Sequence, residues 1–395
     1  MFERFSTSRR LQVGLLVALL ALTAWGAHAG SRVRQVTPTP VSTVSVQPPA
    51  TPRVEVAFVL DTTGSMSGLI EGAKRKIWSI ANQLASGQPR PKISIALIAY
   101  RDRGDAYVTR LHDLTDDIDG VYAQLQQLGA DGGGDTPESV NQALHEAVTR
   151  LAWSSDTNVY RAIFLVGDAP PHLDYQDDVK FARSVARARQ RGIVINTVQC
   201  GDFAETTPIW QQIASTGGGT FAAISQDGGM LALATPMDDE LARLNADLAS
   251  TLVPYGAPAE QAELLEKSDR AARAEPAAVA SRLGFLSKLG GKLNSGRADL
   301  VDAITSGDKK LADVPEKELP ASLAAMAPAA REEFVKEKLE ARQKTQKRID
   351  ALTAERDKYV ADESARRAAS GKDDGFDSKV RDAVRKQAAV AGITY

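Results

Sequence analysis

The feature that most constrains the fold is a series of short, almost continuously apolar runs separated by amphipathic stretches. The first run is residues 54–60 (VEVAFVL), and residues 161–166 (RAIFLV) and 193–199 (IVINTVQ) are of the same kind. Such runs are typical of strands that are buried on both faces of a sheet. Residues 66–84, after the first run, have apolar side chains at helical spacing. This alternation predicts an α/β fold with a doubly wound, mostly parallel sheet and helices on both faces.

Further elements of the same kind fill residues 53–253, which we expect to form one domain. Two more strands are expected, at residues 93–100 and 220–224, and residues 106–112 should pair with the former as an edge hairpin. The remaining helices are expected at residues 116–128, 139–151, 177–191, 207–215 and 239–252. In sheets of this type ligands bind at the carboxyl ends of the strands.

Residues 1–29 have the three parts of an export signal. Arginines precede the apolar run 11–26, and Ala27-His28-Ala29 offers a signal peptidase site. The run is shorter than the roughly 20 residues that span a bilayer, so we expect cleavage after Ala29 and a periplasmic or extracellular protein. Without cleavage the segment would anchor the chain in the membrane. Residues 30–52 are rich in Pro and Thr, which predicts an extended linker.

Residues 254–395 are expected to be a helical C-terminal segment without strands. They are rich in Ala, Lys, Arg, Glu and Asp, with interrupting glycines and prolines. Helices are expected at residues 259–273, 297–305, 329–365 and 379–391. Few apolar residues lie between Leu339 and Ile349, so we favour a charged helix, or half of a helical hairpin, over a coiled coil. Partial disorder is the other alternative for this segment.

Composition argues against several classes of partner. The chain of 395 residues has a formal net charge of −2. Neither nucleic acid nor an anionic membrane is therefore expected as a partner, and no membrane contact is expected beyond the signal segment. Cys200 is the single cysteine, so no internal disulfide can form. We interpret it as a small buried residue.

Three short segments put oxygen-bearing side chains at the expected carboxyl edge of the sheet. Asp61, Thr63 and Ser65 follow the first strand, Thr136 follows a glycine-rich loop, and Asp168 follows the RAIFLV strand. We predict that these residues bind one divalent metal ion. Hard oxygen ligands suit Mg²⁺, Mn²⁺ or Ca²⁺ rather than zinc. Because only two of the ligands are carboxylates, the ion would stay electrophilic and would accept a carboxylate from a partner.

The segments DTTGS, GGGDT and GDAPP, in this order, resemble the metal-ion-dependent adhesion site of von Willebrand factor A domains and integrin I domains. The family pattern is D-x-S-x-S, then a distant Thr and a distant Asp, and Thr63 replaces the first Ser while keeping the hydroxyl. The resemblance covers about residues 53–252. It implies that the helix expected at residues 239–252 occupies the place of the last helix of I domains, which shifts when the site engages a ligand.

The resemblance also implies how each ligand acts. It implies direct ligation by Thr63 and Ser65, ligation in one state by Thr136, and often water-mediated ligation by Asp61 and Asp168. Asp135, beside the metal-binding Thr, departs from the simplest pattern. It could pair with Arg101 or Arg103 or raise the affinity for the metal. We leave it out of the ligand set because of charge balance.

Other residues near the site have simpler interpretations. His172 and Asp174 could touch a ligand at the rim, but a solvated loop is favoured, because one His without a positioned partner is weak evidence for catalysis. Arg103-Gly104-Asp105 spells the tripeptide that integrins bind. It falls where a tight turn is expected, and Gly-Asp is common in turns. An ordinary helix N-cap would explain one hydroxyl of DTTGS, but not three segments at one edge.

The function predicted from these features is that of an exported, non-enzymatic module that captures an Asp or Glu of a protein partner through the divalent cation. A Mg²⁺-dependent hydrolase of phosphatase type is one alternative. Such enzymes need a second Asp two residues after the first, where Thr63 stands, and no acid, base or nucleophile is evident. The other alternative is a structural scaffold that acts mainly through the C-terminal helices.

Overall fold

The computed structural model describes residues 51–229, 233–290, 298–370 and 375–395. The expected signal peptide at residues 1–29 and nearly all of the expected linker at residues 30–52 lie outside the described residues. Among the helices of the described part, none combines the length and the apolar character that a membrane crossing requires.

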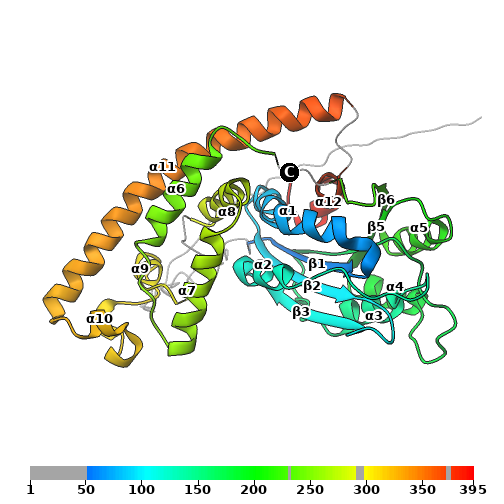
Figure 1. Ribbon diagram of the computed structural model, residues 1–395, viewed down its shortest axis with the longest axis horizontal. Coiled ribbons are helices and arrows are strands. Elements are labelled where there is room, and N and C mark those ends of the chain that lie inside the picture. The colour runs from blue at the N-terminus through cyan, green and yellow to red at the C-terminus, as the bar shows by residue number, and fades with distance from the viewer. Residues whose placement is uncertain (1–50, 230–232, 291–297, 371–374) are drawn as a thin grey trace, which may run out of the picture. The chain divides into compact units, whose positions relative to one another are not determined.

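A six-stranded sheet forms the centre of the fold, in the order β3-β2-β1-β4-β5-β6 (Figure 1). The strands are β1 (Arg53–Asp61), β2 (Lys92–Tyr100), β3 (Thr109–Thr115), β4 (Val159–Gly167), β5 (Ile193–Cys200) and β6 (Gly218–Ile224). All neighbours pair in parallel except β2 and β3, which form the antiparallel edge. The chain runs outward from β1 through β2 to one edge, then from β4 to the other. The expected doubly wound, mostly parallel sheet is confirmed, and its switch point lies between β1 and β4.

Side chains alternate along each strand between two separate cores. In β1, Val56 and Phe58 belong to one core, whereas Ala57 and Val59 belong to the other. Helices α1 (Ser67–Ala85), α2 (Ile118–Gln126) and α12 (Phe376–Gln387) contribute to the first core, and α3 (Val140–Thr149), α4 (Phe181–Gln190) and α5 (Thr206–Thr216) to the second. Helices therefore cover both faces, as the strand pattern predicted, because each strand has to bury both of its sides.

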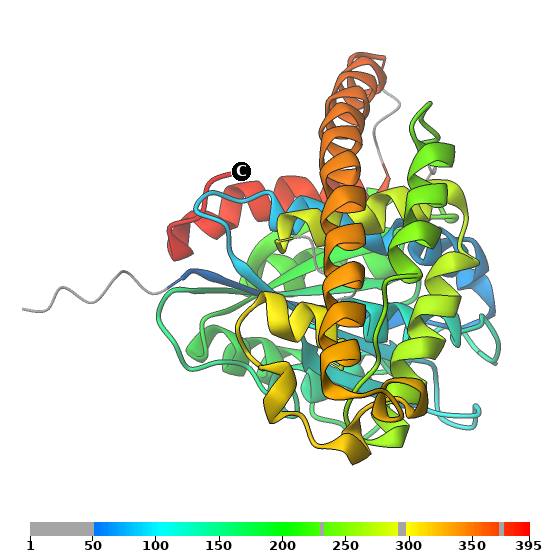
Figure 2. The same cartoon turned by 90° about the vertical axis from the view of Figure 1, so that its left-hand side faces the viewer.

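The segment between β6 and α12 forms what we call the helical arm. Its helices are α6 (Asp238–Ala249), α7 (Pro258–Ala272), α8 (Pro276–Lys288), α9 (Leu300–Thr305), α10 (Ala321–Ala324) and α11 (Pro328–Ala369). The sequence analysis missed α8. Helix α11 runs for 42 residues without a break (Figure 2). Its Ile349 and Leu352 pack with α6 and α8, so the expected charged helix is confirmed, and it packs within its own chain.

The C-terminal residues return to the sheet. Phe376, Val380 and Val384 of α12 are buried in the same core as α1, and α12 lies beside α1 and β6 (Figure 1). Beyond it, the backbone of Thr394 pairs with that of Gln88. Helix α12, not the helix expected at residues 239–252, thus lies on the sheet in the place of a last helix.

A helix was expected at residues 239–252 in the place of the last helix of I domains. The helix forms, but the expected place was wrong. Helix α6 forms there, but its Leu241 and Leu248 pack with α8 and α11 of the arm. A stripe of leucines shows that one side of a helix is buried, yet it does not show which surface covers it.

Candidate metal centre

The predicted site lies at the switch point of the sheet. Strand β1 ends at Asp61, and Asp168 follows the last residue of its neighbour β4. The pairing of Leu60 with Val166 brings these two strand ends to the same level. Gly167 makes the approach possible, because a Cβ there would lie 2.9 Å from the Asp61 Cβ. Two carboxylates from segments more than 100 residues apart therefore meet at one point of the edge.

Asp61 is the most buried member of the predicted ligand set, with no exposed surface. Its Oδ1 accepts hydrogen bonds from the backbone N–H of Thr63 at 2.9 Å and from the Thr63 hydroxyl at 2.6 Å. The Thr63 hydroxyl lies 3.4 Å from that of Ser65. Oδ2 of Asp61 has no hydrogen-bond partner among the described residues. Burial raises the pKa of Asp61 to about 7, and the charge of Asp168 adds to the shift, whereas the hydrogen bonds from Thr63 and the nearby Tyr100 hydroxyl lower it.

A cavity of about 360 Å³ opens above these residues. We call it the edge pocket, and its lining comprises Ser65, Asp135, Thr136, Glu138, Asp168, Ala169, Asp202, Phe203 and Gln226. Ser65, Thr136 and Asp168 line it, and Ser65 and Thr136 are exposed. Asp61 and Thr63 are buried and do not line the pocket, but the hydroxyl of Thr63 connects Asp61 to Ser65.

The loop that carries Thr136 is held by backbone hydrogen bonds to the residues that follow β1. The N–H of Asp131 donates to the Thr62 carbonyl at 3.2 Å, and the N–H of Gly64 donates to the Gly132 carbonyl at 3.2 Å. Gly132 has a positive φ of 78°, a conformation in which a glycine is favoured. The glycine-rich run therefore lets the loop fold back over the DTTGS segment.

Glu138 is a component of the site that the sequence analysis missed. Its side chain lines the edge pocket but is only 4% exposed overall, and its Oε2 has no hydrogen-bond partner among the described residues. Burial raises its pKa to about 9, and the charges of Asp61 and Asp102 add to the shift. Its position two residues after Thr136, just ahead of α3, was the signal that could have revealed it.

Gln226 is the second component that was missed. It follows the end of β6, and its Nε2 donates to Oδ2 of Asp168 at 2.8 Å and to the Ser65 carbonyl at 3.2 Å. This amide therefore connects two of the three predicted segments. Only its place at the carboxyl edge of the sheet could have indicated it, because one Gln after a strand carries no motif.

Of the two possibilities left open for Asp135, a pairing with Arg101 or Arg103 is not found among the described residues. In the described part of the chain, Arg103 forms ion pairs with Asp177 and Asp178 instead. Arg101 donates to the carbonyls of Thr62 and Gly129, and its guanidinium approaches Asp131 at 3.6 Å. The reason is that both arginines are already held by neighbouring loops, and Asp135 points to His172 instead.

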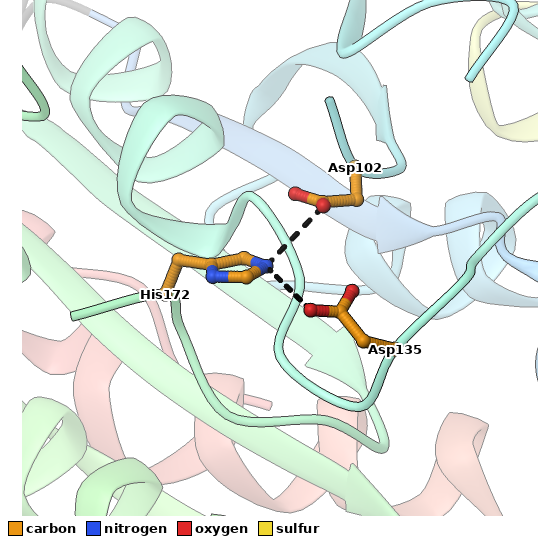
Figure 3. Close-up of side chains that lie close together, drawn as sticks. All are labelled: Asp102, Asp135 and His172. Atoms are coloured by element: carbon orange, nitrogen blue, oxygen red, sulfur yellow. Dashed lines mark ion pairs between the residues drawn. The ribbon is translucent and has the colours of Figure 1, made fainter. Parts of the chain in front are cut away.

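The expectation of a solvated His172 is also wrong. His172 is only 4% exposed, because its backbone N–H donates to the Glu138 carbonyl and the adjacent Pro171 forms a bridge with Glu138. Its Nδ1 lies 2.8 Å from Oδ1 of Asp174, and its Nε2 faces Asp102 and Asp135 (Figure 3). A lone histidine in the sequence proves to be the centre of an acidic cluster.

Two simpler interpretations are confirmed. Cys200 is buried. The Arg103-Gly104-Asp105 tripeptide forms a turn, in which Gly104 has a positive φ of 98°. The carboxylate of Asp105 accepts hydrogen bonds from the backbone of Asp102 and Gly133, so the tripeptide is held against the site.

This sheet and the oxygen-rich pocket at its switch point define a doubly wound α/β domain of the ligand-binding type. Residues 55–235 match the family model of the von Willebrand factor A domain. This part of the chain is therefore a von Willebrand factor A domain, and domains of this class generally serve in protein interaction and adhesion.

The relatives that match are much longer proteins. The chain is 33% identical to the von Willebrand factor A domain-containing protein 7 of the rat over 174 residues, which are 42% of this chain and 17% of the rat protein. It is 30% identical to mouse Hemicentin-2 over 187 residues, 46% of this chain and 3% of that protein. Among solved structures, the SpRpn10 VWA domain aligns with 15% identity and a TM-score of 0.35, over 45% of this chain and 89% of that one. The chain thus spans less than a fifth of the curated relatives.

Proposed function

We propose that the protein is an exported module that binds a protein partner through a divalent cation in the edge pocket. The observation that carries the proposal is Asp61, a fully buried carboxylate whose Oδ2 has no hydrogen-bond partner among the described residues. A buried ionised carboxylate without compensation is costly. A cation at this point would compensate it.

The side chains around the pocket fit such an ion. Asp61, Thr63, Ser65, Thr136 and Asp168 would hold it, and their oxygen atoms suit Mg²⁺, with Mn²⁺ or Ca²⁺ as alternatives. When bound, the ion supplies a positive centre that a carboxylate can coordinate. Ser65 and Thr136 face solvent, so an Asp or Glu of a partner can reach this centre from outside.

Glu138 modifies the proposal. Glu138 lines the pocket together with Asp135, Asp168 and Asp202. Each further anionic ligand raises the affinity for the metal and lowers the demand for an external carboxylate. The proposed roles are therefore opposed: Asp61 and Asp168 hold the ion, and Glu138 competes with the partner. We expect Glu138→Gln to weaken metal binding while strengthening partner capture at saturating Mg²⁺.

The test is capture of partners from the exported fraction by the mature chain, with Mg²⁺ or with EDTA. Capture is expected only with Mg²⁺, and Asp61→Asn should abolish it. Asp247→Asn is the matched control, since this exposed carboxylate lies on α6, outside the edge pocket. Capture by the wild type that persists in EDTA, or capture by Asp61→Asn with Mg²⁺ at the wild-type level, would exclude a metal-dependent site.

A further inference from the structure

Beside the edge pocket, three side chains from three loops converge. Asp102 follows β2, Asp135 precedes α3, and His172 follows β4 (Figure 3). His172 Nε2 lies 3.2 Å from Oδ2 of Asp102 and 3.8 Å from Oδ2 of Asp135. We propose that this cluster is a second metal site, which binds a first-row transition ion such as Zn²⁺. The inference does not rest on the Mg²⁺ site proposed above, although Asp135 also lines the edge pocket.

The protons of His172 give the first reason. The Asp174 carboxylate, when ionised, can only accept, so the Nδ1 that lies 2.8 Å from it carries the proton of a neutral ring. Nε2 then presents a lone pair to two carboxylates. This atom is buried and has no hydrogen-bond partner among the described residues. A lone pair and two carboxylates that face one another are suited to bind a cation between them.

The spacing of the three atoms gives the second reason. Zinc binds histidine nitrogen and carboxylate oxygen at about 2.0–2.2 Å. Two such ligands in a tetrahedral arrangement lie about 3.4 Å apart, and His172 Nε2 lies 3.2 Å from Asp102 Oδ2 and 3.8 Å from Asp135 Oδ2. The ligand atoms of all three residues lie within 4.8 Å of one another. Only a small shift of the exposed Asp135 is needed to close the set.

The surroundings hold the two buried ligands in place. The Ser139 hydroxyl donates to Oδ1 of Asp102 at 2.7 Å, and the Tyr175 hydroxyl donates to its Oδ2 at 2.9 Å. The ring of Tyr175 also stacks on that of His172, with the centroids 4.0 Å apart. A carboxylate on the far nitrogen of a ligating histidine, here Asp174, is the usual support in metal sites and fixes the ring.

The donor atoms select the ion. Imidazole nitrogen suits Zn²⁺ and other transition ions, whereas the edge pocket offers oxygen alone and suits Mg²⁺. Three protein ligands leave a position open, and the side chain of Asp135 is 62% exposed on that side. Because Asp135 precedes Thr136, an ion here would also fix the loop that carries Thr136 and Glu138 over the edge pocket.

Zinc binding to the EDTA-stripped full chain, at saturating Mg²⁺, tests the proposal. We expect one Zn²⁺ per chain, with a histidine nitrogen in the X-ray absorption spectrum. His172→Gln and Asp135→Asn should each lower the Zn²⁺ affinity by about 10–100-fold. Asp135 is exposed, so Asp135→Asn keeps the test valid if the His172 variant fails to fold. Asp131→Asn, an exposed acid of the same loop, is the control and should bind Zn²⁺ like the wild type.

Two results would overturn this inference. One is an unchanged Zn²⁺ affinity in the Asp135 variant. The other is an NMR signal of a proton on His172 Nε2 that persists at saturating Zn²⁺, which would assign the cluster to an imidazolium ion pair. Asp61→Asn separates the two proposals, because it should remove Mg²⁺ binding and leave Zn²⁺ binding intact.

Discussion

Buried acids of the helical arm and buried acids of the sheet edge are treated in opposite ways. In and beside the arm, each has a buried arginine: Asp119 pairs with Arg282, Asp238 with Arg356, and Asp299 with Arg342. At the sheet edge, Asp61 and Glu138 are equally buried, yet no Lys, Arg or His of the described residues forms an ion pair with either. The two groups of acids are similarly buried, but only those in and beside the arm have a cationic side chain as a partner.

This difference indicates that the buried acids of the arm stabilise the fold, whereas those of the sheet edge are available to bind a ligand. Removing a carboxylate from water costs several kcal/mol unless a partner compensates it. The arm compensates this cost within its own chain, through ion pairs that join α8 to α2, α6 to α11, and the N-cap of α9 to α11. The sheet edge has no such partner for Asp61 and Glu138 among the described residues. Their raised pKa values show that each acid holds its proton more tightly there, and we propose that a bound cation takes the place of that proton.

The largest effect on the free energy of unfolding is expected when a buried ion pair of the arm is broken. Arg342→Met leaves Asp299 buried without its cation, and we expect the free energy of unfolding to fall by about 3–5 kcal/mol. Urea denaturation measures it. The double variant Arg342→Met/Asp299→Asn should recover part of the loss. A single variant as stable as the wild type would show that the arm does not depend on this pair.

The second-largest effect is expected when Mg²⁺ is added, because the ion would supply positive charge at the sheet edge. A ligand that binds only the folded state stabilises it by about 2.7 kcal/mol at 100 times its dissociation constant. We therefore expect Mg²⁺ to raise the free energy of unfolding by this amount, measured against EDTA at matched ionic strength. No rise at any Mg²⁺ concentration would contradict a cation site.

A smaller effect is expected from Asp61→Asn in EDTA. The variant removes a buried charge that has hydrogen bonds from Thr63 but no cationic partner among the described residues, so its stability should stay within about 2 kcal/mol of the wild type or exceed it, in contrast to Arg342→Met. The stabilisation by Mg²⁺ should disappear. A large loss of stability in EDTA would mean that Asp61 acts structurally, as the arm acids do.

The smallest effect on the free energy of unfolding is expected from an exposed ion pair of the arm. It tests whether the burial of a pair decides how much that pair contributes to stability. Arg348 and Glu240 form an ion pair at 2.7 Å, but their side chains are 51% and 38% exposed. Exposed pairs contribute about 0–1 kcal/mol. Arg348→Ala should change the free energy of unfolding by no more than this, and a change as large as that of Arg342→Met would remove the distinction.

The sheet could be predicted from the sequence because its signal is local. Short apolar runs rich in β-branched residues, such as residues 54–60, favour buried strands, and the helices between them follow from the spacing of their apolar residues. The place of α12 could not be predicted, since an amphipathic helix does not reveal which surface covers it. The same limit applies to α6, whose leucines pack in the arm.

The residues of the candidate site also fall into two groups: those that the sequence could reveal and those that only the folded chain shows. Asp61, Thr63 and Ser65 lie within five residues of one another, and the strand ends fix where Asp168 lies, so a pattern could find them. Glu138, Gln226 and His172 reach the site through contacts between distant loops. Their residue types are common in loops, and only the folded chain shows that they are buried or aimed at the pocket.

The most direct test of the central claim is a crystal structure of the protein with Mn²⁺ and its anomalous difference map. We expect a strong peak at the edge pocket, within about 2–2.5 Å of the Thr63 and Ser65 hydroxyls, and no peak there in crystals of Asp61→Asn. A map without density at the carboxyl end of β1 at saturating Mn²⁺, with Asp61 still buried and unpaired, would contradict it.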